Sequence, residues 1–382
     1  TVTEKGVTTT LNMDVAPYVD ANTWRTYVPV RFAAQAFDCM VGWDQSASTA
    51  IIIDTEKLVD NAMAGKNFTY LEKMSAMGKK YNTGIWNANM DLNAQVGLLG
   101  MLVTVTGNVE ETIQDADKMS AVFNMKMDMS AMVHAMSALG AGEVTAEDRA
   151  LLEAMKTKGM DMTMRGDMTS GKFYMNMDLT NLGVTAADGF DPAAWYELDM
   201  AQLMAQSGMD MDWSQLLNTS KNADALDTVV SMLSNSVELD NAANDYADIK
   251  AMVEELLTAF SDQGFVAQDG KQVSSYTLTT TTDNTTISAA LSLTLDGDAV
   301  KSYTLGLDIS AQSDGQTVSM GALSSLDDAG HTDGNVTMDM AGLLSLDMDM
   351  TGAYTPGATA PVTTPPAGAT VIPFSQLMAG AN

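Results

Sequence analysis

The sequence predicts an α+β protein in which a small N-terminal domain precedes a large curved antiparallel β-sheet, a half-barrel with helices on its concave face. The main observation is that five segments place methionine or leucine at every second position, with aspartate in the gaps. Successive side chains of a strand point to opposite faces, so each segment predicts a strand with one methionine face and one polar face. The segments are residues 125–129, 160–164, 175–179, 209–211 and 346–350.

A second observation is an internal repeat near the C-terminal end. Residues 269–278 (DGKQVSSYTL) resemble residues 296–305 (DGDAVKSYTL), and each copy is an Asp-Gly turn followed by a strand. Such a repeat predicts a meander of antiparallel hairpins. Sheets of this kind can bury one face and leave the other in water.

The first 55 residues predict a separate unit. We expect a strand over Val7–Val15, a short helix over Phe32–Phe37 and a strand over Ala50–Asp54. Residues 56–80 then predict a helical linker, because apolar side chains recur there at intervals that suit one helix face.

This N-terminal segment resembles a known family. Residues 14–18 (DVAPY), 25–32 (RTYVPVRF) and 41–44 (VGWD), followed by a β-rich run, are similar to the stalk domain named after the copper amine oxidase N-terminus. Asp38 stands where that domain usually has a glycine. The resemblance implies a small α+β domain on a bacterial surface protein. It implies neither the copper site nor the quinone of the oxidase.

The second domain is predicted over residues 81–353. Alternation is longest over residues 119–129, and we expect Met125, Met127 and Met129 to face the helices while Lys126 and Asp128 face solvent. Residues 132–138 fit either an extension of this strand or a helix. Thr145 can cap a helix that runs to Lys156. A hairpin is expected at residues 160–179, and a mainly helical insert over residues 181–262, whose last helix covers residues 245–260.

The order of strands, helical insert and further hairpins resembles the half-barrel of the LolA and LppX lipoprotein-carrier group. Residues 173–177 (FYMNM) and 195–198 (WYEL) are similar to recurring turns of that group, and the likeness spans residues 81–350. It implies binding of lipid or lipoprotein acyl chains in the concave face, although a fold alone does not transfer an activity.

Composition argues against several classes of function. The chain has 382 residues and a formal net charge of -30, and such a field repels nucleic acid and anionic membranes. Two histidines and one cysteine, Cys39, leave little for a triad or a zinc site. We find no phosphate-binding loop, no calcium loop and no apolar run that could span a membrane. We therefore expect a non-enzymatic protein without cofactor or metal.

The methionines leave three interpretations open. They can form an ordinary sheet core, a soft surface that adapts to lipid or apolar peptide, or a Cu(I) site, because thioethers bind soft metals. Only His134 and His331 are available as further soft-metal ligands, and neither lies in a ligand cluster. The candidate apolar groove consists of Met125, Met127, Met129, Met160, Met162, Met164, Met175 and Met177.

The C-terminal residues 354–382 predict an extended Pro/Thr/Ala-rich tail with an apolar end. This end can dock on its own subunit or on the sheet edge of an adjacent one, which would build a homo-oligomer or polymer. We therefore expect a secreted, extracellular or surface protein of a Gram-positive-type bacterium that self-assembles into a filament or layer, or alternatively a module that carries lipid or apolar peptide. A start at Thr1 fits removal of a signal peptide, or equally a trimmed chain. The candidate assembly residues are Val371, Ile372, Phe374 and Leu377.

Overall fold

A computed structural model describes residues 2–4, 7–9, 18–20, 22–35, 39–96, 101–115, 117–140, 144–183, 191–202, 239, 241–279, 285–313 and 316–374. The chain divides into two compact units. The first unit contains Thr1–Thr69 and Met204–Phe265, and the second contains Tyr70–Leu203 and Val266–Asn382. No described helix is long and apolar enough to cross a membrane.

The first unit contains three small two-stranded sheets among its described residues. They are β1 (Val2–Glu4) with β2 (Val7–Thr9), β3 (Tyr18–Asp20) with β4 (Arg25–Tyr27), and β5 (Cys39–Asp44) with β6 (Thr49–Asp54). Helix α1 (Val30–Gln35) precedes β5, and α2 (Thr55–Met63) follows β6. The start of the expected first strand, most of the expected short helix and the closing strand are therefore present, and residues 10–15 and 36–37 of the first two predictions lie outside the described residues.

Helix α9 (Asp245–Phe260) packs on α2 in the first unit. Its buried stripe includes Ile249, Val253, Leu256 and Leu257, each at most 1% exposed. Sequence analysis assigned this helix to an insert in the sheet domain. Here the apolar stripe is buried within the unit that contains α2, so residues 204–265 belong with the N-terminal segment. The other helices expected between residues 203 and 238 lie outside the described residues.

The expected linker helix is two helices. Helix α2 ends at Met63, and α3 (Thr69–Gly78) begins six residues later, followed by a 3-10 turn η1 (Lys79–Tyr81). Gly65, in the break, has a φ of +78°, a conformation that glycine adopts without steric cost and that a continuing helix does not contain. Apolar periodicity alone therefore predicted one helix where a glycine divides two.

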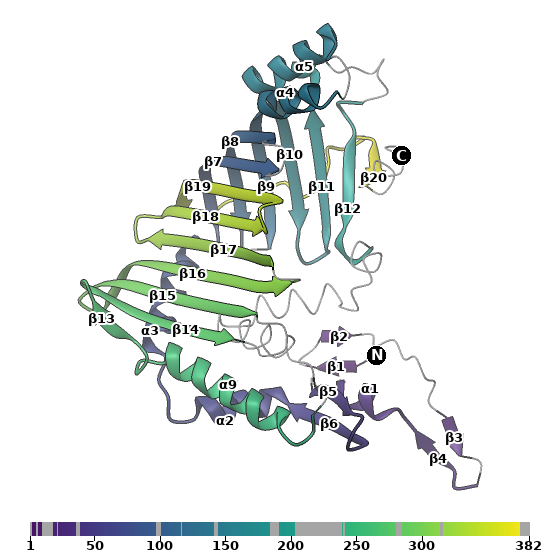
Figure 1. Ribbon diagram of the computed structural model, residues 1–382, viewed down its shortest axis with the longest axis vertical. Helices are drawn as coiled ribbons and strands as arrows, with labels where there is room; N and C mark the ends of the chain where they lie inside the picture. The colour runs from purple at the N-terminus through teal and green to yellow at the C-terminus, as the bar shows by residue number, and fades with distance from the viewer. Residues whose placement is uncertain are drawn as a thin grey trace. The chain divides into compact units, whose positions relative to one another are not determined.

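The second unit is built on a 14-stranded sheet of the described residues, so the predicted α+β class with a large curved antiparallel sheet is confirmed. Its order is β13-β14-β15-β16-β17-β18-β19-β7-β8-β9-β10-β11-β12-β20. The C-terminal meander and the earlier hairpins thus join where β19 pairs with β7. Figure 1 shows the strand direction turning steadily across this sheet, as the intrinsic twist of strands requires.

The first half of the sheet comes from the middle of the chain. Its strands are β7 (Gly84–Val96), β8 (Met101–Gln114), β9 (Lys118–Asp128), β10 (Met160–Asp167), β11 (Lys172–Asp178) and β12 (Trp195–Asp199). Helix α4 (Ser130–Ala138) contacts β8, and α5 (Ala146–Thr157) contacts β9. Residues 132–138, which fitted strand or helix, are therefore helical. The expected Thr145 cap of α5 is a reciprocal capping box with Asp148.

The second half follows α9. Its strands are β13 (Val266–Gln268), β14 (Lys271–Thr279), β15 (Thr286–Asp296), β16 (Ala299–Ser313), β17 (Gln316–Asp327), β18 (His331–Met340) and β19 (Leu344–Pro356). The two repeated Asp-Gly segments are its hairpin turns. In the first of them Asp269 and Gly270 both have positive φ, as a two-residue hairpin with a type I′ turn requires.

Strand register gives the sheet one continuous apolar face. Directly paired residues stand on the same side, and most pairings on this face join an apolar residue to an apolar residue from strand to strand. One row, listed from β14 across to β9, shows this: Tyr276, Ala289, Leu307, Ala322, Val336, Met348, Leu92, Val105 and Met127.

The face is packed as a core over β14–β17. Leu291 and Leu293 of β15 are at most 1% exposed, and Leu326 of β17 is also buried. Helix α3 supplies the buried Met74 and Met77 to the same unit. At the C-terminal end of this helical segment the Tyr81 hydroxyl donates to the Asp328 carbonyl, 3.0 Å away.

The last described strand, β20 (Val371–Pro373), pairs in parallel with β12 of its own chain. The segment before it runs along the sheet: the Thr359 hydroxyl donates to the Ile113 carbonyl at 2.7 Å, and the Trp195 N–H donates to the Thr370 carbonyl at 2.8 Å. We call residues 357–370 the strap. The tail therefore docks within its own subunit, which is one of the two alternatives that the sequence left open.

Candidate apolar binding face

The predicted groove methionines come together by direct strand pairing. Met162 of β10 lies opposite Met177 of β11 and opposite Phe123 of β9. Met164 pairs with Met175 in the same hairpin. Since these partners share one side of the sheet, their thioethers form one methionine surface instead of separate stripes.

Further methionines extend this surface toward the centre of the sheet. Met125 pairs with Met160, and Met127 pairs with Val105 of β8. Met129 differs from Met125 and Met127, because β9 ends at Asp128 and Met129 is the N-cap residue of α4. Residues that sequence analysis left out of the groove also belong to this face: Met90, Met101, Met119, Met338, Met348 and Met350.

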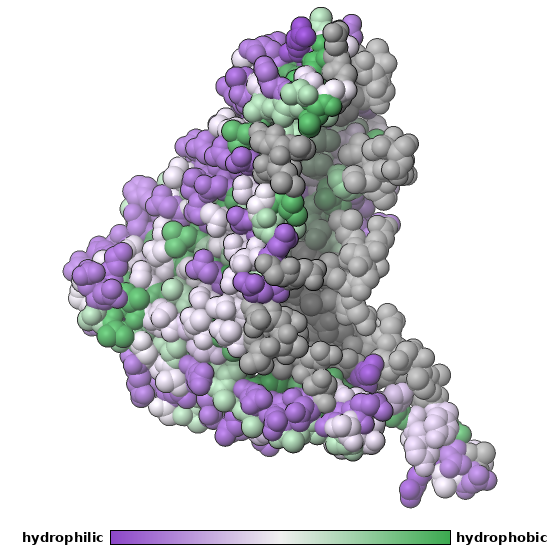
Figure 2. Space-filling view, viewed as in Figure 1, coloured by the Kyte–Doolittle hydropathy of each residue, from purple (hydrophilic) through white to green (hydrophobic). Residues whose placement is uncertain are grey.

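The side chains on this methionine-rich half are half-buried. Along β7 exposure alternates from Trp86 to Gln95, so that Asn89 and Asp91 are exposed whereas Met90 and Leu92 are partly covered. On β9, Lys126 is exposed while Asp128 forms an ion pair with Lys156 at 2.8 Å. Figure 2 shows hydrophobic residues in a hollow beside the upper strands and hydrophilic residues on their outer surface. The methionine face is thus more accessible than the core over β14–β17.

The backbone under this face is already hydrogen-bonded. Strands β7–β11 each have a ladder partner on both sides. Their N–H and C=O groups therefore bond within the plane of the sheet. What the face presents to a ligand is thioether and hydrocarbon, which can repack around chains of different shape.

One carboxyl group interrupts the apolar face. Glu111 of β8 stands in the same phase as Val109 and Ile113, directly between Trp86 of β7 and Ala121 of β9. Burial raises the pKa of its carboxyl group above the ordinary glutamate value. Among the described residues, none forms a hydrogen bond or ion pair with this carboxyl. Sequence analysis missed Glu111, although its two-residue spacing from Val109 and Ile113 places it among the apolar residues of β8.

Three aromatic rings lie on one side of this carboxyl group: Trp86 is its neighbour on β7, and Tyr81 and Tyr354 line the same pocket. The Tyr354 ring lies 5.7 Å from the Tyr81 ring and 5.8 Å from the Trp86 ring, centroid to centroid. The Trp86 N–H donates to the Thr332 hydroxyl at 3.1 Å, and the Tyr81 hydroxyl bonds the backbone. Burial raises the pKa of the Tyr354 hydroxyl, and the nearby Glu111 carboxylate raises it further. The polar atoms of Tyr81 and Trp86 are thus engaged in the protein.

A pocket of about 260 Å³ opens at this place, on the methionine face. Its walls combine hydrocarbon, aromatic rings and a few polar groups, which is the usual composition of a ligand site. The lining residues are Tyr81, Asn82, Glu111, Ile113, Asp117, Lys118, Met119, Met168 and Tyr354.

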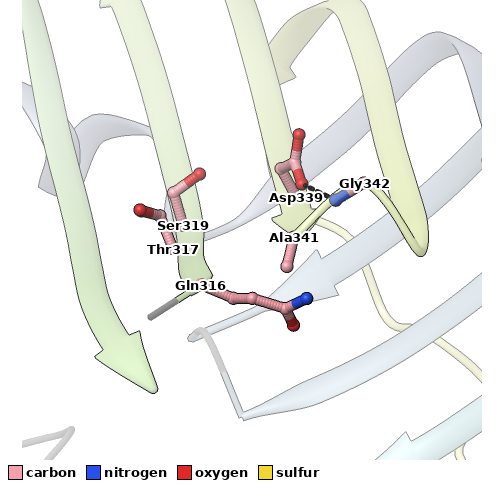
Figure 3. A pocket seen from close by; sticks show the side chains of 6 residues that line it. All are labelled: Gln316, Thr317, Ser319, Asp339, Ala341 and Gly342. Atoms are coloured by element: carbon pink, nitrogen blue, oxygen red, sulfur yellow. Dashed lines mark hydrogen bonds between the residues drawn. The ribbon is translucent and has the colours of Figure 1, made fainter. Parts of the chain in front are cut away.

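A larger depression of about 370 Å³ lies near the turn between β18 and β19 (Figure 3). Its labelled side chains, which include Gln316, Thr317 and Ser319, are polar or small. The Asp339 carboxylate accepts the Gly342 N–H at 2.8 Å and so closes the turn. None of its lining residues has a large apolar side chain, so we place the candidate site at the methionine face and its Glu111 pocket.

The opposite face of β10–β12 carries the strap. The Arg165 guanidinium lies 4.6 Å from the centre of the Trp195 ring and donates to the Thr364 carbonyl at 2.8 Å. Trp195 is only 6% exposed. Of the candidate assembly residues, Val371 and Ile372 pair with Trp195 and Tyr196 of their own chain. Phe374 directly follows β20, and Leu377 lies outside the described residues.

Metal ligands do not gather in the described part of the chain, where no group of three histidine, cysteine or acidic side chains could hold an ion. His331 pairs with Asp327 at 2.8 Å, and the His134 ring nitrogen lies 2.9 Å from the Ser130 carbonyl. Cu(I) binding by the thioethers alone stays an open alternative.

Comparison with family models agrees with the resemblance seen in the N-terminal segment. The family model for the copper amine oxidase N-terminal domain matches residues 6–79. Similar solved structures include a candidate outer membrane lipoprotein-sorting protein domain from Vibrio parahaemolyticus, with 7% identity and a TM-score of 0.27, covering 76% of this chain and 93% of that one. A DUF1329 family protein from Desulfovibrio piger has 7% identity and a TM-score of 0.26, with coverage of 77% and 95%. No curated protein matches the sequence.

Proposed function

We propose that this protein is an extracytoplasmic, non-enzymatic binding protein that holds the acyl chain of a lipid or another amphiphile against the methionine face of its sheet. The observation that supports this proposal is the register of β7–β11, which aligns methionines into one half-accessible apolar surface. Strands β7, β8 and β9 have 13, 14 and 11 residues. At about 3.3 Å per residue they are roughly 36–46 Å long, enough for a long hydrocarbon chain.

An acyl chain fits this face better than an apolar peptide does. A peptide brings amide groups that need hydrogen-bond partners, and leaving them unpaired on an apolar surface is costly. The strands under the face are paired on both sides over most of their length, and β20 already occupies part of the edge of β12. A hydrocarbon chain needs no such partner.

The test is a homologous series of uncharged ligands, 1-octanol, 1-nonanol and 1-decanol, titrated by calorimetry. Each buried methylene is worth about 0.8 kcal/mol, so the affinity is expected to rise roughly fourfold per carbon. Lipid extracted from the protein purified from its native host provides a second readout. An affinity that does not change with chain length would contradict the proposal.

Self-assembly through the tail is the second candidate, and one observation favours it. Strand β20 has three residues, and an extended strap connects it to β19. The same parallel pairing with β12 can form between two chains without any new contact, as in domain swapping. A net charge of -30 per subunit opposes such assembly. We therefore place it second.

A further inference from the structure

We propose that Glu111 and the aromatic rings beside it bind a cationic head group, so that the ligand of the methionine face is an amphiphile carrying an ammonium group. This inference rests on the proposed function, because it assigns the head-group end of the same apolar face. Its subject is the pocket of about 260 Å³ that Glu111, Tyr81 and Tyr354 line.

The first argument is the isolation of the carboxyl. Glu111 is held between strands, with Trp86 and Ala121 as its direct neighbours on the face. Its partial burial penalises the ionised form, and among the described residues no cation pairs with it. An acidic group in such a position is stabilised by a proton or by a cation that enters with the ligand.

Lys118 is the nearest candidate for an internal partner, because it lines the same pocket. Its side chain is nevertheless exposed, and it forms no ion pair with Glu111. The carboxyl is therefore available to a ligand. Asp117 adds a second acidic side chain to the pocket wall, so the lining favours a positive over a negative head group.

The second argument is the set of rings. Cations are attracted to aromatic faces at up to about 6 Å, and ammonium groups that carry methyl groups are bound in this way. The rings of Tyr81 and Trp86 each lie within stacking distance of the Tyr354 ring, and Trp86 is the direct neighbour of Glu111 on β7. Because the polar atoms of Tyr81 and Trp86 bond within the protein, these residues contribute ring surface more than hydrogen bonds.

The third argument is the electrostatic field of the whole chain. A chain of net charge -30 concentrates cations and repels fatty acids and anionic lipids from its surface. This general attraction does not depend on any one residue and is screened by salt. A specific site at Glu111 must therefore be separated from it by experiment.

The experiment compares three ten-carbon ligands, decyltrimethylammonium, 1-decanol and decanoate, by calorimetry below their micelle concentrations and in 0.5 M salt. We expect the full-length protein to bind the cation at least tenfold more tightly than the alcohol. Glu111→Gln should lose roughly 10- to 100-fold of the affinity for the cation, as removal of a charge-assisted contact does, and keep the affinity for 1-decanol.

Glu110→Gln is the matched control, because Glu110 is the next residue, is exposed and stands on the opposite face. It removes the same charge and should leave both affinities unchanged. Equal loss in both variants, or equal affinity of the parent for the cation and the alcohol, would overturn the assignment of Glu111. If none of the three ligands binds, the proposed function fails as well, which is a different result. If Glu111→Gln does not fold, the test is the ratio of the parent protein's affinities for decyltrimethylammonium and 1-decanol, and a ratio of one would overturn the assignment.

Discussion

Met162 of β10 lies directly opposite Met177 of β11, and both side chains stand on the same face of the sheet. A period of two in each strand makes a continuous surface only when the strands also align in register. A slip of one residue would bring Asp161 to the place of Met162. The register, more than the number of methionines, therefore creates the apolar face.

A positive charge on this face is expected to abolish the binding of uncharged chains. Met90→Lys places an ammonium group in the middle of β7 on the apolar side, where a hydrocarbon ligand would remove it from water. We expect the affinity for 1-decanol to fall at least tenfold. Asn89→Lys is the control, because Asn89 is exposed on the other face. Equal affinities of the two variants for 1-decanol would contradict binding at the methionine face.

The Arg165–Trp195 contact is expected to hold the strap. Arg165→Ala removes both the cation–π contact and the hydrogen bond to Thr364, together worth about 1–2 kcal/mol. Limited proteolysis should then cut residues 357–370 faster, and the fluorescence of Trp195 should report a wetter environment. Lys126→Ala, an exposed change on β9, should leave the cleavage rate unchanged. A strap that is equally resistant in both variants would show that other contacts hold it.

Asp44 is expected to make the first unit sensitive to acid. Its carboxylate accepts hydrogen bonds from the Ala47 N–H at 2.8 Å, the Ser46 hydroxyl at 2.7 Å and the Ala242 N–H at 2.9 Å. These bonds lower the pKa of Asp44 from 3.8 to about 2. A lowered pKa means that the ionised group stabilises the fold above about pH 4 and that this stabilisation disappears as the pH falls toward 2.

The measurement is the urea midpoint of Asp44→Asn against the parent between pH 7 and pH 2. We expect a lower midpoint for the variant at pH 7 and a difference that shrinks below pH 4. Asp60→Asn, an exposed change on α2, should follow the parent at every pH. A difference that stays constant down to pH 2 would contradict the role given to the Asp44 carboxylate.

Removal of the tail distinguishes docking within the chain from assembly between chains. Because β20 covers the edge of β12, a chain that ends at Pro356 exposes the N–H and C=O groups of that edge. We expect light scattering to show a monomer for the full chain and concentration-dependent association for the truncated one. Filaments of the full chain that vanish on truncation would instead establish assembly through the tail.

Much of the sheet could be predicted because strand signals are local. The two-residue spacing in residues 160–164 and 175–179 gave both the hairpin and the face that its methionines occupy. A repeated Asp-Gly turn likewise predicted the meander. Each of these features depends on residues that are neighbours in the sequence.

The remaining features depend on distant or ambiguous residues. Pairing of Tyr196 with Ile372 joins segments that are far apart in the chain. Strand β20 has only three residues, which is too short for a two-residue alternation to predict a strand there. The start of α4 was ambiguous because Met129 and Met132 fit both a strand and a helix. Glu111 was passed over as one of many acidic residues, since only its phase within β8 distinguishes it from Glu110.

The most direct test of the account is photolabelling with an uncharged ten-carbon chain that carries a diazirine, followed by peptide mapping. The account predicts saturable labelling that 1-decanol competes away, located on residues of the methionine face such as Met90, Met125, Met162 and Met177. Labelling that does not saturate, or that falls on the opposite face at residues such as Asn89 and Lys126, would contradict it.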